Sequence, residues 1–479
     1  MMMNKILERD YLALMRTHFR GFIERSFCEL NPTTEFKDNW HIGVIAYELD
    51  QVRLGKTKRL IINVPPRSLK SHCASVAFPA WLLGHDPSCQ IICASYAQDL
   101  SNKLASDCRS LMMSHTYQRI FPARLWSQRP ALQELITTRK GFRLATSVGG
   151  VLTGRGADYL IIDDPLKPDE ALSETERPKV NDWYDHTLLT RLNDKRNGCI
   201  IVIMQRLHED DLVGHVLEKE HWRVVCFPAI AEANETYTIW TPLGRKIYRR
   251  SEGDVLHPAR EDRATLDKIA ATLGSYNFAG QYQQRPSPLG GGLIKESWFQ
   301  TYTHQSRPEK WDFMFQSWDT ANKPTELSDY SVCTTWGMKK KDLYLLHVYR
   351  KRLDYPTLKR AVVDQAQLWS ATSVVIEDKA SGTQLIQDLI NDGMYGIKRY
   401  EPPPGQDKIM RMHSCSSTIE NGFVYLPEKA EWLAEYLHEL KTFPNGKHDD
   451  QVDSTSQALQ WVKQRYLNKN TVTFTTVLL

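Results

Sequence analysis

The sequence lacks the features that mark a membrane protein or a disulfide-stabilised secreted protein. Its 479 residues contain no run of about 18 or more apolar residues, so no transmembrane helix is expected. The nine cysteines are odd in number and none forms a Cys-x-x-Cys pair, while Cys93, Cys199 and Cys226 lie in apolar runs. This usage predicts reduced thiols in a cytosolic compartment and argues against a zinc site.

A strong charge bias is also missing. Lys and Arg total 61 and Asp and Glu total 57, so the net charge of +4 neither requires nor excludes a nucleic-acid partner. There is no internal repeat and no low-complexity tract. The hydrophobic content of 41% is that of an ordinary globular protein, and the length favours two or three domains. The first segment, MMMNKILERDYLALMRTHF, predicts an amphipathic surface helix rather than a signal peptide.

Short apolar runs alternate with helical patterns between residues 58 and 230. Continuous β-branched runs of this length are typical of parallel strands that are buried on both faces. We therefore expect a mainly parallel α/β domain over 58–230, preceded by a helical extension or lid over 1–57. The predicted strands are RLIINV (59–64), QIICAS (90–95), FRLAT (142–146), YLIIDD (159–164), CIIVIM (199–204) and WRVVCF (222–227).

A second pattern begins near residue 301 and continues to 464. The intervening segment 231–300 is rich in turn residues, and QRPSPLGGG (284–292) is the best candidate for a linker. The order of strands and helices in the second domain predicts a mixed sheet, and the tail 465–479 has no clear period. The predicted elements are strands over 313–319, 331–337, 343–349 and 373–378, and helices over 356–370 and 450–464.

One phosphate-binding loop is recognisable although its glycines are missing. The usual pattern is Gly-x-x-x-x-Gly-Lys-Ser/Thr, and here Val64 and Leu69 stand at the two glycine positions. Lys70 and Ser71 still follow a buried strand and open a helix, where they would bind phosphates and Mg²⁺. Arg67 lies in the loop, where its guanidinium could bind a phosphate by two hydrogen bonds.

The strand YLIIDD supplies the acidic partners of this loop. We expect Asp163 to hold Mg²⁺ and Asp164 to position and activate the attacking water. Each motif alone has a simpler interpretation. A strand, a turn and a helix that begins with Lys-Ser often have only a structural role, and two aspartates after a strand often cap a helix. The two motifs in this order favour a nucleotide site, in which the backbone N–H groups of 67–71 face a phosphate. The predicted cofactor-binding residues are Pro66, Arg67, Ser68, Leu69, Lys70, Ser71, Asp163, Arg155, Gln205 and Arg206.

Three of those residues come from outside the two motifs. Arg155 lies upstream of the second strand and could stabilise charge at this site or at that of a neighbouring subunit. Gln205 and Arg206 end the strand CIIVIM, where a sensor or coupling residue would lie. Trp40 could flank an adenine, although a core tryptophan is the simpler interpretation.

Carboxylates recur at the ends of elements in the second domain. Asp319 ends one strand, Glu377 ends another, and Asp450 and Asp453 lie on one face of the last helix. Each motif alone is also typical of a turn or of a helix start. Together they predict a site for two Mg²⁺ or Mn²⁺ ions, because such ions need several hard carboxylates from rigid elements. Less certain members of this set are Asp449, Asp378 and Asp329.

Basic residues near this acidic set are candidates for DNA contacts. Lys408 and Arg411 lie one turn apart in EPPPGQDKIMRM, a spacing that suits a DNA backbone. Lys379 and His448 could orient a phosphate or a water molecule.

The motifs as a set resemble the large terminase subunit of tailed bacteriophages. The resemblance spans about residues 40–460. It implies an N-terminal P-loop ATPase domain of the RecA/ASCE-like kind and a C-terminal ribonuclease-H-like nuclease of the RuvC/integrase type. Leu69 and Asp164 depart from the glycine and the glutamate that are usual in the family. The matching pieces are WH (40–41), INVPPRSLKS, TGRGADYLIIDDP, MQRLHEDDLVG, FAGQYQQRPSP, SWDTANK, VVIEDKASGTQLIQDL and HDDQVDS.

The resemblance also implies function and partners. ATP hydrolysis would drive double-stranded viral DNA into a procapsid, and the endonuclease would cut concatemeric DNA. The implied partners are a small terminase subunit, the portal protein and further copies of this chain, which form a ring on the portal, expected to be a pentamer, and are monomeric in solution. The protein would act in the host cytoplasm and would be absent from the virion. The implied catalytic residues are Asp164, Arg67, Asp319, Glu377 and Asp453, and the implied metal ligands are Ser71, Asp163, Asp319, Glu377, Asp450 and Asp453.

Two other interpretations remain open from the sequence. A helicase–nuclease of DNA repair or recombination would combine the same two activities, but it would need a second RecA-like domain. A degenerate prophage protein that only binds its partners would explain Leu69, but it would not explain the complete acidic set.

Overall fold

The computed structural model describes residues 2–126, 133–152, 154–242, 244–286, 293–320, 330–379, 381–403, 405–444, 446 and 448–473. The chain divides into two compact units, Met1–Pro288 and Leu289–Leu479. The division falls inside the Pro- and Gly-rich segment 284–292. None of the described helices is long and apolar enough to cross a bilayer.

A seven-stranded sheet forms the centre of the first unit. Neighbouring strands pair in parallel, except that β3 pairs antiparallel with β4 at the edge. Six of the strands are the six apolar runs. The short β3 was not predicted, because three residues are too few to show a period. In spatial order the strands are β3 (Glu134–Ile136), β4 (Phe142–Ser147), β2 (Gln90–Ser95), β5 (Tyr159–Asp163), β6 (Cys199–Met204), β1 (Arg59–Asn63) and β7 (Arg223–Cys226).

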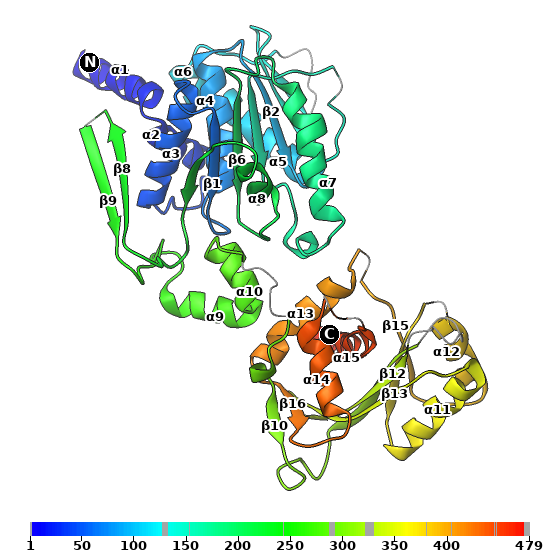
Figure 1. Ribbon diagram of the computed structural model, residues 1–479. Coiled ribbons are helices and arrows are strands. Elements are labelled where there is room, and N and C mark those ends of the chain that lie inside the picture. The colour runs from blue at the N-terminus through cyan, green and yellow to red at the C-terminus, as the bar shows by residue number, and fades with distance from the viewer. Residues whose placement is uncertain are drawn as a thin grey trace, which may run out of the picture. The chain divides into compact units, whose positions relative to one another are not determined.

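Helices cover both faces of this sheet (Figure 1). Alternate residues of β1 show why the strands are continuously apolar: Leu60 and Ile62 belong to one core cluster and Ile61 to the other. Each such side chain contributes about 1.5–3 kcal/mol when fully buried. On the Leu60 side lie α1 (Met2–Thr17), α2 (Phe19–Leu30), α3 (Trp40–Arg53), α4 (Phe78–His85), α5 (Gln98–Met113) and α6 (His115–Ile120), and on the Ile61 side lie α7 (Glu176–Trp183) and α8 (Leu212–Leu217).

Regular structure is also present in the segment 231–286, part of which was predicted to be only turn-rich. β8 (Glu235–Thr241) and β9 (Gly244–Arg250) form an antiparallel hairpin beside α3 (Figure 1), and α9 (Arg263–Leu273) and α10 (Ser275–Asn277) follow. The strand in GRKIYRR was missed because its exposed face carries cations instead of the usual mixture of small polar residues. The buried face is aromatic, since Tyr237 and Tyr248 pack against Trp40.

The second unit is built on a mixed sheet, as predicted, and this sheet has seven strands. β11, β12 and β13 are antiparallel, whereas β14 and β15 continue from β11 in parallel. In spatial order the strands are β10 (Gln300–Tyr302), β16 (Val424–Pro427), β13 (Asp342–Lys351), β12 (Ser331–Lys339), β11 (Phe313–Asp319), β14 (Ser373–Glu377) and β15 (Ile397–Tyr400).

Five helices flank the second sheet. α11 (Tyr355–Leu368) and α12 (Ser381–Asn391) cover one face, and α13 (Lys408–Glu420), α14 (Leu433–Thr442) and α15 (Asp450–Thr473) cover the other. α15 extends past residue 464, so the first part of the predicted tail is helical. Short single turns are η1 (His72–Ala77), η2 (Pro168–Glu170), η3 (Tyr184–Leu188), η4 (Leu189–Arg191), η5 (Phe278–Tyr282) and η6 (Glu296–Trp298).

Candidate functional sites

The loop after β1 borders a cavity of about 970 Å³, which we call the loop cavity. Pro66, Arg67, Ser68, Leu69, Lys70 and Ser71 all line it, together with Asp164 and Gln205 from the ends of β5 and β6. These strands are neighbours in the sheet and run in parallel, so their carboxyl ends bring the motifs together, as the sequence predicted.

The turn through this loop uses two left-handed residues. Arg67 has φ = 61° and Leu69 has φ = 60°, so Leu69 has the backbone conformation that a glycine would adopt without strain. The left-handed conformation costs roughly 1–2 kcal/mol for a residue with a Cβ atom. The Leu69 side chain is half-buried against the core of the first unit, which offsets part of this cost.

Lys70 and Ser71 bind the two aspartates that end β5. The Lys70 Nζ lies 2.7 Å from Asp164 Oδ1, and the Lys70 side chain is 8% exposed. The Ser71 hydroxyl donates to Asp163 Oδ1 at 3.0 Å, and the Ser75 hydroxyl donates to Asp163 Oδ2 at 2.7 Å. Burial, with the neighbouring Asp164 charge, raises the pKa of Asp163 to about 6. A divalent cation would favour the ionised form of this buried carboxylate, so Ser71 and Asp163 fit a Mg²⁺ ion by their chemistry.

His41 also belongs to this site, although only its place in the piece WH pointed to it. It is buried, and its Nε2–H donates to the Ser68 carbonyl at 3.3 Å while Asn39 Nδ2 donates to its Nδ1 at 2.7 Å. Burial lowers the pKa of His41 to about 3, so the ring is neutral at neutral pH and holds the loop backbone. Its neighbour Trp40 packs among aromatic side chains of the hairpin and does not line the cavity.

The structure places the other predicted residues differently. Gln205 lines the cavity and its backbone N–H lies 3.4 Å from Asp164 Oδ1. Arg206 does not line the cavity: its Nε lies 3.0 and 2.9 Å from the two oxygens of Asp211, and its backbone N–H donates to Gln284. Arg155 forms an ion pair with Glu134 at 2.8 Å, also outside the cavity lining. A role for Arg155 at a neighbouring subunit stays a prediction.

Helix α2 and the segment after it form a wall of the loop cavity that was not predicted. Phe27, Leu30, Asn31, Thr34, Glu35 and Lys37 line this wall, and Tyr96, Leu100, Lys103 and Asp107 line the part that α5 borders. No motif marks these residues, because they come from two segments that only the folded sheet brings to the same opening.

In the second unit, α15 carries acidic residues to the ends of β11 and β14. Trp318 pairs with Ile376 in the sheet, so Asp319 and Glu377 follow side by side. Gln457 of α15 donates to the carbonyls of Trp318 and Val375 and so joins the helix to both strands. Buried polar side chains explain why this helix lacks an apolar face there: Ser454, Thr455, Ser456 and Gln457 are all inaccessible.

A glycine fixes the turn that follows Glu377. A Cβ atom on Gly382 would lie 2.1 Å from the Glu377 carbonyl oxygen, so only glycine lets α12 begin so close to the strand. The predicted neighbour Asp378 faces away from the set and pairs with Arg399 at 3.1 Å.

Two cations of α13 are bound within the acidic set. Arg411 lies 3.1 Å from Asp453 Oδ1 and 3.4 Å from Glu377 Oε2, and Lys408 lies 2.7 Å from Asp453 Oδ2 and 2.8 Å from Asp449. The Arg411 side chain is 7% exposed and binds carboxylates in this structure, and its contact with a DNA backbone stays a prediction. Lys408 is half-exposed and is bound in the same way.

The electrostatics of this set indicate an excess of negative charge. Burial raises the pKa of Asp319 well above its ordinary value, and repulsion from Asp453 and Asp450 adds to the shift. Burial also raises the pKa of Asp453, against the pull of Lys408 and Arg411. Burial opposes the charge on Lys408, but Asp453 and Asp449 outweigh this and raise its pKa.

Hard carboxylates in a buried, negative site suit divalent cations by their chemistry. Across the parts of the chain that the structure describes, however, no three such side chains converge as the ligands of one ion. Both oxygens of Asp453 are occupied by Lys408 and Arg411, which supply the positive charge in their place.

Three predicted residues remain. Lys379 is exposed next to Glu377, and the His448 ring packs edge-on against Tyr330 at 5.6 Å. Asp329 lies outside the described residues.

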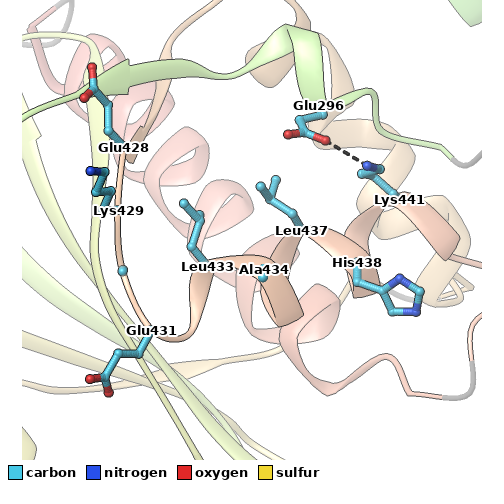
Figure 2. A pocket seen from close by; sticks show the side chains of 10 residues that line it. Glu296, Glu428, Lys429, Glu431, Leu433, Ala434, Leu437, His438 and Lys441 are labelled. Carbon is cyan, nitrogen blue, oxygen red and sulfur yellow. Dashed lines mark hydrogen bonds and ion pairs between the residues drawn. The ribbon is translucent and has the colours of Figure 1, made fainter.

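A second hollow, of about 850 Å³, lies on the outer face of α14 (Figure 2). Leu433 and Leu437 form its floor, and Lys441 pairs with Glu296 across it at 2.8 Å. The charges around it have both signs, so they do not select a ligand.

Comparison with known proteins identifies the class of this fold. Residues 316–461 match the family model described as the terminase RNaseH-like domain. The large terminase of a thermophilic bacteriophage has a similar structure, with a TM-score of 0.50 at 9% identity over 87% of this chain and 98% of that chain. No curated protein sequence matches.

Two further solved structures are similar at lower scores. The HK97 bacteriophage large terminase has a TM-score of 0.36 at 13% identity and covers 85% of this chain and 89% of that chain. The large terminase nuclease of the thermophilic phage G20c, solved with bound cobalt, has a TM-score of 0.29 at 15% identity and covers 36% of this chain and 98% of that chain.

The chain therefore combines a mainly parallel α/β unit with a mixed unit of the ribonuclease-H-like class, which confirms the predicted fold. Residues 316–461 match the model of the terminase RNaseH-like domain, and the fold is similar to that of a phage large terminase, so the expected resemblance to the large terminase subunit of tailed bacteriophages is confirmed.

Proposed function

We propose that this protein is the motor and nuclease subunit of a viral DNA-packaging machine. ATP hydrolysis in the first unit would drive double-stranded DNA into a procapsid, and the second unit would cut concatemeric DNA at a two-metal site. One observation carries the proposal: a terminase RNaseH-like domain follows, in the same chain, a phosphate loop whose Lys70 and Ser71 contact the two aspartates at the end of β5.

In the loop cavity, the loop residues would bind the phosphates of ATP. Lys70 would move from Asp164 to the outer phosphates, which compete for its charge, and Arg67 would bind from the exposed side. Asp164 would then be free to take a proton from the attacking water. Ser71 and Asp163 would hold Mg²⁺, which supplies positive charge to the phosphates.

In the second unit, Asp319, Glu377, Asp450 and Asp453 would hold two Mg²⁺ or Mn²⁺ ions. These ions would activate water and stabilise the leaving oxygen of a phosphodiester. Lys408 and Arg411 keep the carboxylates paired with cations until then, so they would prevent a buried cluster of unpaired charges.

The proposed partners are double-stranded viral DNA, a small terminase subunit, a portal protein and further copies of this chain. We propose that the copies form a ring on the portal, with five subunits as the expected number, and that they act in the host cytoplasm. The helicase–nuclease alternative lacks support, because the described residues of the first unit form one mainly parallel sheet and one small hairpin.

The ATPase assignment is tested with Lys70→Ala in the full chain. We expect the rate of ATP hydrolysis to fall by at least about 100-fold, since a charged group at the transferring phosphate is removed. Lys56→Ala removes an exposed lysine from the loop before β1 and should have no effect. Unchanged hydrolysis in the Lys70 variant would place the ATPase site elsewhere.

The nuclease assignment is tested by cleavage of plasmid DNA with Mn²⁺. We expect Asp453→Ala to remove cleavage, whereas Asp364→Ala, which changes an exposed carboxylate on α11, should leave it unchanged. Cleavage that survives the Asp453 substitution would refute the assignment.

A further inference from the structure

The first turn of α15 is held by two side chains that neither motif includes. This turn carries Asp450 and Asp453, and the residues that hold it are Glu439 of α14 and Arg350 of β13. Arg411 of α13 binds Asp453 of the same turn.

Glu439 caps α15 from outside the helix. Its Oε1 accepts from the backbone N–H of Gln451 at 2.6 Å and of Val452 at 3.4 Å, and its Oε2 accepts from the Gln451 side-chain amide at 2.7 Å. The first N–H groups of a helix have no partner within the helix, so a carboxylate there satisfies them and matches the helix dipole. Glu439 is 5% exposed, which means that water does not compete for these bonds.

Arg350 connects this cap to a predicted metal ligand. Its Nη2 lies 3.6 Å from Glu439 Oε2 and 3.9 Å from Asp450 Oδ2, at ion-pair distances. The aromatic ring of Tyr330 covers the guanidinium, with 3.8 Å between the guanidinium carbon and the ring centre. The Arg350 guanidinium therefore lies under the ring, hydrogen-bonded to Glu435 through Nη1 and at ion-pair distance from the two buried carboxylates.

A buried carboxylate is a costly way to fill this space. The inner face of α14 otherwise consists of Tyr436 and Leu440, and an apolar residue at 439 would extend that face without burying a charge. The outer face of the same helix forms the floor of the hollow in Figure 2 and does not bury a charged side chain. What Glu439 adds is a directional attachment of the helix end that carries Asp450 and Asp453.

We propose that Glu439 and Arg350 are positioning residues of the nuclease. They fix the first turn of α15 so that Asp450 and Asp453 stay at the ends of β11 and β14, and Arg350 also orients the Asp450 carboxylate. Neither residue touches the phosphodiester. Ser454 and Gln457 attach the helix to the sheet after its first turn, so they cannot replace a cap at that turn. The inference rests on the proposed nuclease function.

The test measures Mn²⁺ binding by isothermal titration calorimetry on the full chain with Glu439→Gln. The amide keeps one acceptor oxygen but turns a donor toward the Gln451 amide and Arg350. We expect the Mn²⁺ affinity to fall by at least about tenfold, as is usual when an outer partner of a metal site is changed. In DNA cleavage, kcat should fall and the KM for DNA should stay constant, because the substituted group does not contact DNA.

Glu435→Gln is the matched control. Glu435 lies one turn earlier on α14 and also pairs with Arg350, but its side chain is 64% exposed. The described first turn of α15 is capped by Glu439 and not by Glu435. Exposed ion pairs contribute little, so we expect less than about a twofold change in Mn²⁺ affinity.

Arg350→Lys provides a second test if Glu439→Gln does not fold. Lysine keeps the charge but loses the planar group that reaches two carboxylates under Tyr330, so a drop in Mn²⁺ affinity of several-fold is expected. Circular dichroism melting of each variant separates this effect from simple destabilisation.

A folded Glu439→Gln or Arg350→Lys protein that binds Mn²⁺ like the unchanged chain would overturn the inference. This failure differs from that of the proposed function: if the unchanged chain neither binds Mn²⁺ nor cuts DNA, the nuclease assignment itself falls. If the unchanged chain does both and the two variants do as well, only the positioning role is lost.

Discussion

The two candidate sites differ in how the charges of their carboxylates are compensated. Both place carboxylates at the carboxyl ends of parallel strands: Asp163 and Asp164 at the end of β5 alone, and Asp319 and Glu377 at the ends of the neighbours β11 and β14. In the loop cavity, Asp164 is paired with one lysine and Asp163 with two hydroxyl groups. In the nuclease site, carboxylates outnumber the cations that hold them, and burial with mutual repulsion raises the pKa of Asp319 well above its ordinary value.

The difference indicates what each site needs from its ligand. The loop cavity is nearly balanced, so a phosphate must attract Lys70 away from Asp164. The nuclease site has an excess of negative charge, so added cations compensate it directly. Activity at the loop cavity should therefore depend mainly on the loop residues. Activity at the nuclease site should depend mainly on the charges of its side chains.

Asp319→Asn should produce the largest effect. Removing a proposed metal ligand is expected to cost several kcal/mol of transition-state stabilisation, or about 1000-fold in plasmid cleavage. ATP hydrolysis should stay unchanged, because the substitution lies in the other unit. A parallel loss of both activities in a folded protein would show that the two sites do not act separately.

His41→Gln tests whether the loop cavity depends on a neutral ring. Burial lowers the pKa of His41 to about 3, whereas the unfolded chain takes up this proton near its ordinary value of 6.5. The stabilising contribution is therefore complete above pH 6.5 and is lost as the pH falls toward 3. The expected slope is about 1.4 kcal/mol per pH unit, or about 2 kcal/mol between pH 6.5 and 5.

Urea unfolding of the first unit at pH 7 and pH 5 measures this slope. The His41→Gln variant should lose about 1–3 kcal/mol at pH 7, the usual cost of disturbing a buried hydrogen bond, and its stability should depend less on pH. His221→Gln replaces an exposed histidine and serves as the control. Equal slopes for the unchanged chain and the His41 variant would contradict the buried neutral ring.

Lys408→Ala should change the Mn²⁺ affinity in the direction opposite to Glu439→Gln. Metal ions compete with Lys408 for Asp453, so its removal should tighten Mn²⁺ binding by about tenfold, which corresponds to about 1.4 kcal/mol. The metal-free protein should melt at a lower temperature, because the buried Asp453 carboxylate loses one of its two cationic partners. Weaker Mn²⁺ binding would mean that Lys408 supports the metal site.

The smallest effect concerns the loop itself. Leu69→Ala keeps the strain of φ = 60° and loses packing, whereas Leu69→Gly loses the same packing and relieves the strain. The glycine variant should therefore be more stable than the alanine variant by about 1 kcal/mol, reversing the order usual in regular structure. Thermal melting of the two variants decides this, and a more stable alanine variant would exclude a left-handed residue at this position.

The strands located from the sequence are those with longer, continuous apolar runs, namely β1, β2, β4 to β7 and β11 to β14. The sequence did not locate β3, β8, β9, β10, β15 or β16. Of these, β3, β10, β15 and β16 have only three or four residues, and β9 has its exposed side covered by cations. The end of α15 was missed because its polar residues show no helical period after residue 464.

Most of the candidate site residues were predicted because they are polar or charged residues that lie at or just after the end of a predicted strand. Asp163, Lys70, Asp319 and Glu377 needed only a strand and a residue type. Arg411 was predicted for a different contact, since the sequence could not tell whether its guanidinium faces DNA or Asp453. His41 and Glu439 had no motif of their own, because their roles depend on which helix packs beside them.

The sequence by itself determined the longer strands of the two sheets, the phosphate loop and the acidic set, since periodicity and strand-end chemistry are local properties of the chain. Only the tertiary structure decided which charges neutralise one another. The side chains that neutralise or fix the acidic set come from distant parts of the chain or carry no distinctive spacing. Packing alone determines the partners of these residues, which are Lys408, Arg411, Arg350 and Glu439.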